Sequence, residues 1–156
     1  MDFILKLLGF YKAEVIPMVS PMFKNDSERL KNEYNALIDK NKDLYDAIND
    51  LALFMRTKLN KSLIITMIYR TDEEQAEIYK NSPKYKEKPF KSPHQFWQAW
   101  DTHSLDLSTA QISTIVDYLN QKYNETNYYS VTCMYHEIDN LGYHLHSQFI
   151  KKTINK

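Results

Sequence analysis

Two histidines stand two positions apart near the C-terminus, in the segment GYHLHSQF (residues 142–149), and the chain has only five histidines in all. The segment has the composition of a β-strand, in which every second side chain lies on the same face. His144, His146 and Gln148 are therefore expected on one face, with the apolar side chains on the other. Such a pair of imidazoles indicates either a metal-binding face or a polar strand face, exposed to solvent, that happens to contain histidines.

A second group of candidate ligands lies upstream, in SPHQFWQAWD (residues 92–101). On a continuous α-helix, His94 and Asp101 would lie about 10.5 Å apart along the axis. One zinc ion, with ligand bonds of about 2 Å, could not bind both at that separation. A shared metal therefore requires a bend, with His94 on a loop or helix end and Asp101 on a following strand, and Pro93 favours such a bend. A capped helix whose aromatic residues pack in the core is an equally open alternative.

Together, the two segments offer two imidazoles and one carboxylate, and water can take the fourth position on a metal. This open arrangement is typical of catalytic zinc, whereas structural zinc sites are closed. Neutral imidazoles and a carboxylate suit Zn²⁺. The chain has a single cysteine, Cys133, which excludes a disulfide framework and a thiolate-rich zinc finger.

The elements that must position these residues begin with a helical pattern. From Ser27 to Leu59, apolar residues recur at spacings of three and four, which predicts one long helix, or two with a break near Asn41, ending near Asn60. Ser27 and the two residues before it offer N-cap oxygens. The β-branched segment SLIITMIY (residues 62–69) predicts a buried strand.

The second half of the chain alternates helical and strand patterns. Thr71 and Glu74 form a predicted capping box, residues 82–93 are expected to form a surface loop, and Ser108 is expected to cap a further helix. YYSVTCMY (residues 128–135) and YHLHSQFI (residues 143–150) predict two strands joined through IDNLG. The fold class expected is α+β, with an antiparallel sheet that contains a C-terminal hairpin, flanking helices and a long N-terminal helix.

Length and charge limit the remaining possibilities. The 156 residues predict one compact domain, with residues 1–60 as an N-terminal helical extension packed on a core of residues 61–156. The formal net charge is zero, which argues against broad electrostatic capture of nucleic acid. The apolar run at residues 3–10 is too short to span a bilayer. This run follows Asp2 rather than a positively charged segment, so we expect no signal peptide. We therefore expect the protein to be made and kept in a cytoplasm.

Four segments, taken in order, resemble the zinc D-Ala-D-Ala carboxypeptidases and L-alanyl-D-glutamate endopeptidases, which share a fold with the hedgehog signalling domain. IYRTDEEQAEIY resembles their strand-Tyr-Arg-Thr-helix segment, SPHQFWQAWD resembles their Ser-x-His-(six)-Asp motif, and YHLH resembles their closing His-x-His strand. MYHEIDNLGYHLHSQF is similar to the small phage-encoded members, which carry a histidine eight residues ahead of His-x-His. The resemblance covers residues 62–149.

The resemblance implies roles for particular residues. His94, Asp101 and His146 correspond to the zinc ligands. His144 corresponds to a residue beside the metal that polarises water or stabilises an oxyanion. Residues 61–156 would then form a zinc peptidase-like core.

Arg70 corresponds to the residue that holds a substrate carboxylate, a role that suits a bidentate guanidinium, although from its position alone it would be an ordinary arginine at a strand end. Ser92 corresponds to the motif serine, which orients the loop or contacts substrate. Many members place a catalytic Glu or Asp three residues before the last zinc ligand. Tyr143 stands at that position here, and His136 and Glu137 are the nearest catalytic substitutes in sequence.

The implied function is a zinc-dependent peptidase that cleaves peptidoglycan stem peptides at a bond flanked by D-residues. It would be a phage or prophage endolysin or a virion-borne wall hydrolase, made in the host cytoplasm and associated with the virion or released to the cell wall. The alternative is a non-catalytic virion structural protein on the same fold that retains zinc, with virion proteins as its partners. Tyr143 and the long helix at residues 27–59 motivate that alternative.

Overall fold

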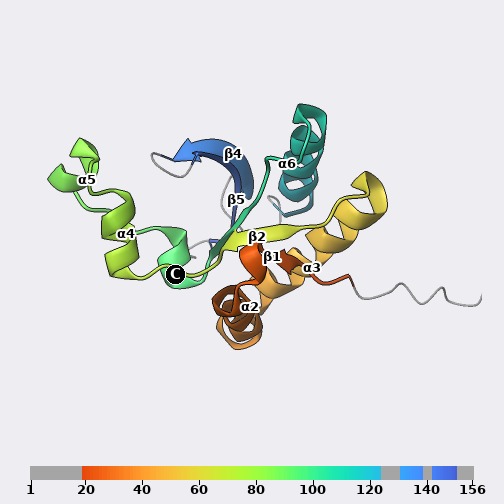
Figure 1. Ribbon diagram of the computed structural model, residues 1–156, viewed down its shortest axis with the longest axis horizontal. Helices are drawn as coiled ribbons and strands as arrows, with labels where there is room; N and C mark the ends of the chain where they lie inside the picture. The colour runs from red at the N-terminus through yellow and green to blue at the C-terminus, as the bar shows by residue number, and fades with distance from the viewer. Residues whose placement is uncertain (1–18, 124–130, 139–141, 151–156) are drawn as a thin grey trace, which may run out of the picture.

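A five-stranded sheet forms the centre of the protein (Figure 1). The computed structural model describes residues 19–123, 131–138 and 142–150. The strands are arranged in the order β1-β2-β3-β5-β4. Their bounds are β1 Met22–Phe23, β2 Ile64–Met67, β3 Ala99–Thr102, β4 Cys133–Ile138 and β5 Gly142–Gln148.

The fold is α+β, but the sheet is mixed rather than antiparallel throughout. The two-residue strand β1 runs parallel to β2, whereas the β2–β3, β3–β5 and β5–β4 pairs are antiparallel. β1 adds an edge strand that the sequence pattern did not reveal, because two residues are too few to show an alternation.

In the described residues two α-helices precede β2, and the predicted break between them is confirmed. α2 spans Glu28–Lys40 and α3 spans Lys42–Phe54. Asn41 lies between them, and its side chain accepts a hydrogen bond from the backbone N–H of Leu44, so it caps α3. A π-helical turn, η2 (Met55–Leu59), ends where Asn60 adopts a left-handed conformation with φ of 50°.

The remaining helical elements are α4 (Asp72–Ile78), α5 (Pro83–Glu87), α6 (Thr109–Tyr123) and the 3-10 turns η1 (Lys24–Asp26) and η3 (Pro93–Phe96). The predicted capping box of Thr71 and Glu74 is present, and the Ser108 hydroxyl caps α6. The prediction of a surface loop at residues 82–93 was wrong for Pro83–Glu87, which form the short helix α5. Ser82 caps that short helix and Pro83 occupies its first turn, a position that proline favours.

One hydrophobic cluster joins the sheet to the helices. Trp100, Leu145 and Phe149 come from the sheet side, and the other members include residues of α2, α3 and α6. α3 and α6 lie side by side, since Phe54 stacks on Tyr118 with ring centroids 3.8 Å apart. Residues of the predicted N-terminal extension therefore belong to the same core as the sheet. Figure 1 shows α4 and α5 at the far left, away from these helices.

Some predictions fall on residues that the structure does not describe. The first part of the predicted strand at residues 128–135 and the middle of the IDNLG connection lie outside the described residues, as do residues 1–18. The helices within the described ranges include none long and apolar enough to cross a membrane.

Candidate metal centre

His94, Asp101 and His146 come together from three separate elements. His94 lies in η3, Asp101 in β3 and His146 in β5, and Asp101 is paired with His146 across the two antiparallel strands. The turn at η3 supplies the bend between His94 and Asp101, so the alternative of one continuous aromatic helix is excluded. The three candidate ligands, which are separated along the chain, are thus brought together at one face of the sheet.

The loop that carries His94 is fixed by its own side chains. The Ser92 hydroxyl accepts a hydrogen bond from the His94 N–H at 3.4 Å, and the Gln95 side-chain oxygen accepts one from the Ser92 N–H at 2.7 Å. Trp97, directly after η3, has a φ of 59°, in the left-handed region that favours glycine. Its ring stacks on Tyr69 with centroids 4.5 Å apart, and this contact offsets part of the backbone strain.

The distances among the three side chains are those of a compact ligand set. Asp101 Oδ1 lies 3.2 Å from His94 Nε2 and 2.8 Å from His146 Nδ1. All three residues are buried, and their candidate ligand atoms lie within 4.8 Å of one another. Ligand atoms around a tetrahedral zinc ion with bonds of about 2.0–2.1 Å lie roughly 3.3 Å apart. Zinc therefore needs only small movements of these side chains.

Backbone carbonyl groups set the orientation of two imidazoles. His94 Nδ1 lies 2.9 Å from the Ile68 carbonyl oxygen, and His144 Nδ1 lies 3.1 Å from the Gly142 carbonyl oxygen. In a neutral ring each Nδ1–H donates to its carbonyl, which leaves Nε2 with a lone pair. His94 Nε2 and the Asp101 carboxylate then face each other as two acceptors, and a proton or a metal cation between them satisfies both. The donor set therefore fits a divalent cation.

The electrostatics of the site favour an ionised carboxylate. Burial opposes ionisation of Asp101, but the neighbouring His94 and His146 imidazoles, by charge and by hydrogen bonds, hold the pKa of that carboxyl well below its usual range. Burial lowers the pKa of His136, and the adjacent His144 and His146 lower it further. The ionised carboxylate, which these contacts favour, is the form of Asp101 that binds zinc.

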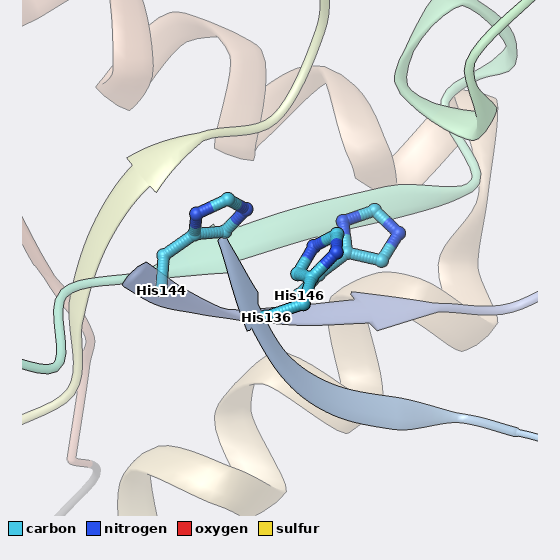
Figure 2. A group of neighbouring side chains, drawn as sticks. All are labelled: His136, His144 and His146. Atoms are coloured by element: carbon cyan, nitrogen blue, oxygen red, sulfur yellow. The ribbon is translucent and has the colours of Figure 1, made fainter. Parts of the chain in front are cut away.

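His136 and His144 lie directly beside this ligand set (Figure 2). His136 of β4 pairs with His144 of β5, and their rings lie 4.7 Å apart between centroids. Figure 2 shows the rings of His136, His144 and His146 on the same side of the two strands. These three residues form a second group whose candidate ligand atoms lie within 4.8 Å of one another. The alternative of a solvent-exposed histidine face is excluded for His144 and His146, because both are buried.

Arg70 is buried in the short segment between β2 and α4, and it has few partners. Its Nη1 donates to the Gln75 side-chain oxygen at 2.8 Å, while Nε and Nη2 have no hydrogen-bond partner among the described residues. Gln75 in turn donates to the Phe90 carbonyl oxygen, two residues before Ser92. The guanidinium is therefore connected through Gln75 to the chain that leads into the His94 loop, and two of its three nitrogen atoms, Nε and Nη2, keep unpaired N–H groups.

Glu137 is not brought into the cluster. It pairs with Tyr143 across β4 and β5, and both side chains are exposed on the face opposite the imidazoles. The Tyr143 ring instead packs near Tyr135, with centroids 5.4 Å apart. His103, the remaining histidine, lies apart from the cluster and faces Asp106 at 3.6 Å.

Sequence reasoning missed the partners that hold the site together. Gln148 Oε1 lies 3.4 Å from His146 Nε2, and its place on the imidazole face was the only sequence signal for this contact. Gln75 gave a signal only through its position one turn after Arg70. The carbonyl groups of Ile68 and Gly142 gave none, because every residue has a carbonyl and only the folded chain selects which one faces a ring.

Comparisons of the chain with models of protein families, with curated proteins and with solved structures found no match.

Proposed function

We propose that the chain is a zinc-dependent peptidase of the hedgehog/DD-peptidase fold that hydrolyses peptidoglycan stem peptides at a bond flanked by D-residues. The observation that carries the proposal is the convergence of His94, Asp101 and His146 from three elements onto one buried carboxylate oxygen. These residues would hold the ion. When bound, Zn²⁺ supplies a Lewis acid that polarises the scissile carbonyl and makes water more acidic.

His144 is the residue we assign to proton transfer. Its Nδ1 is held by the Gly142 carbonyl, and its Nε2 lies 3.7 Å from Asp101 Oδ1 with no hydrogen-bond partner in the described part of the chain. In the proposed hydrolysis, Nε2 accepts a proton from the attacking water as the new C–O bond forms. The same atom returns the proton to the leaving amine as the C–N bond breaks.

Arg70 is the residue we assign to substrate binding. Stem peptides carry free carboxylates, and the unpaired Nε and Nη2 donors of this buried guanidinium suit one of them. Ser92 positions the loop of His94 through its hydrogen bond to that residue. Position 97 departs from the family pattern, because it is Trp where many members have glycine, and its φ of 59° lies in the left-handed region.

The proposal is tested by following zinc and activity together. His94→Ala and His146→Ala should each bind less zinc than the wild type and lose the ability to clear suspensions of purified cell walls. His103→Ala is the matched control, since His103 lies outside the cluster, and it should retain both. Protein loaded with one zinc ion per chain that clears no cell wall at any pH would refute the peptidase function, and a protein that never takes up zinc would refute the metal site.

One observation favours the second candidate, a virion structural protein that retains zinc without turnover. Glu137 and Tyr143 lie on the face opposite the imidazoles, and Asp101 is the one carboxylate in the metal-binding groups of the described residues. No further carboxylate is thus available there as a base. Zinc binding and copurification with assembled virions, without release of wall peptides, would favour this candidate over the peptidase.

A further inference from the structure

We propose that His136, His144 and His146 form a second metal position beside the one formed by His94, Asp101 and His146. The two groups share His146 and otherwise differ in every member. The inference extends the proposed function, because it starts from the same metal face, but it concerns a separate ion and a residue, His136, to which the proposed hydrolysis gives no role.

The first support is a pair of buried nitrogen atoms that lack partners. The Nε2 atoms of His136 and His144 are both buried and have no hydrogen-bond partner among the described residues. A buried polar atom left unpaired destabilises the fold, because it has lost its hydrogen bonds to water without a replacement. Two such atoms on rings 4.7 Å apart are satisfied together by one cation that accepts a lone pair from each.

The second support is that the strands hold the rings in place. His136 and His144 stand opposite each other in the antiparallel β4–β5 pair, and His144 is also fixed by the Gly142 carbonyl. The ring of His136 lies 5.5 Å from that of His146 between centroids. A site built from paired strands needs little rearrangement to bind an ion.

The third ligand, His146, has two ring nitrogens. Nδ1 faces Asp101 at 2.8 Å and belongs to the first position. Nε2 is the nitrogen that remains for the second position, and its present contact, with Gln148 Oε1 at 3.4 Å, is long for a hydrogen bond. When both positions are filled, the ring N–H proton of His146 is released to solvent, because a neutral imidazole has one ring lone pair whereas the imidazolate presents one at each nitrogen.

The donor set indicates the class of ion. Three imidazoles without a carboxylate suit Zn²⁺, Cu²⁺, Ni²⁺ or Co²⁺ rather than Mg²⁺ or Ca²⁺, which prefer oxygen ligands. Binding here has a consequence for the proposed hydrolysis, because an ion on His144 Nε2 leaves that atom unable to accept a proton. Zinc in excess over one ion per chain should therefore inhibit wall hydrolysis.

The test measures zinc per chain after equilibrium dialysis of the full-length protein against ZnCl₂. The wild type should bind two ions, His136→Gln should bind one, and the control His103→Gln should bind two. A wild type that binds one ion, or a folded His136→Gln variant that still binds two, would overturn the proposal.

A second measurement on the unmodified chain covers the case in which His136→Gln does not fold. In a zinc titration followed by NMR of the ¹⁵N-labelled imidazoles, the His136 signals should shift with the second equivalent and not with the first. Shifts that end at one equivalent would contradict the second position. If two ions bind but no cell wall is cleared even at one zinc ion per chain, the peptidase function fails and this inference stands. If only one ion binds and cell walls are cleared, the peptidase function stands and this inference fails.

Discussion

Arg70→Met separates a functional role of this arginine from a structural one. The guanidinium is buried to 1% exposure and has one hydrogen-bonding side-chain partner, Gln75, at 2.8 Å. Two of its three nitrogen atoms have no hydrogen-bond partner in the described residues. A residue kept for stability would pair its charge, whereas a residue kept to receive a carboxylate leaves donors free until substrate arrives.

The size of the effect follows from these contacts. Methionine fills much of the same volume and removes two unpaired donors, each of which costs roughly 1–3 kcal/mol when buried. Against this stands the loss of the hydrogen bond to Gln75, whose oxygen is then left unpaired at a similar cost of about 1–3 kcal/mol. We therefore expect Arg70→Met to raise the free energy of unfolding by about 1–2 kcal/mol, which corresponds to a rise of roughly 2–8 °C in Tm.

Urea denaturation of the metal-free protein, followed by circular dichroism, measures this difference. The same variant should lose wall hydrolysis while its zinc content stays unchanged, because Arg70 is not a metal ligand. Arg70→Lys is the matched control, since it keeps the charge but not the planar fork. A variant Arg70→Met that is destabilised by more than about 2 kcal/mol would refute the reasoning and show that the guanidinium supports the fold.

Three further predictions concern the metal and the contacts that frame the site. Removal of zinc by a chelator should lower Tm by roughly 5–10 °C in thermal scans, because an ion at 100 times its Kd adds about 2.7 kcal/mol to a domain of this size; a Tm that does not change would contradict metal binding in the folded state. Asn41→Ala should cost about 1–3 kcal/mol in urea denaturation, because it removes the cap of α3 and the hydrogen bond of 3.0 Å to the Trp97 carbonyl, and a loss below about 0.5 kcal/mol would contradict that role. Asp50→Asn should weaken the α3–α6 contact by about 1–3 kcal/mol, because the carboxylate accepts hydrogen bonds from Lys122 and two tyrosines of α6. Burial opposes ionisation of Asp50, but these donors lower its pKa, so its contribution is present above the ordinary pKa of aspartate and is lost as the pH falls through the lowered value; an equal effect of the variant at pH 7 and at pH 2 would contradict this linkage.

The sequence predicted the parts of the fold that have strong local signals. The break at Asn41, the capping box at Thr71 and the Ser108 cap each depend on a few neighbouring residues, and the structure contains all three. The alternation in residues 142–149 correctly placed the two histidines on one face, because the period of a strand follows from backbone geometry alone.

The parts that could not be predicted depend on contacts between distant segments. β1 exists only because Met22 and Phe23 run beside β2. The position of Glu137 on the opposite face follows from the register of β4 against β5, which the hairpin sets and local composition does not. For the same reason, the pairing of His136 with His144 was not visible in their spacing of eight residues.

The position of β5 in the sheet has a consequence for kinetics. β5 carries His144 and His146 and is hydrogen-bonded on both edges, by β3 and by β4. Exchange of its amide hydrogens with solvent therefore requires at least one neighbouring strand to separate, so these amides should be among the slowest in the described chain. An ion bound at this face can leave without strand separation only if the side chains of its ligands rotate away from it. If strand separation is required, metal release and amide exchange of β5 will have the same dependence on denaturant.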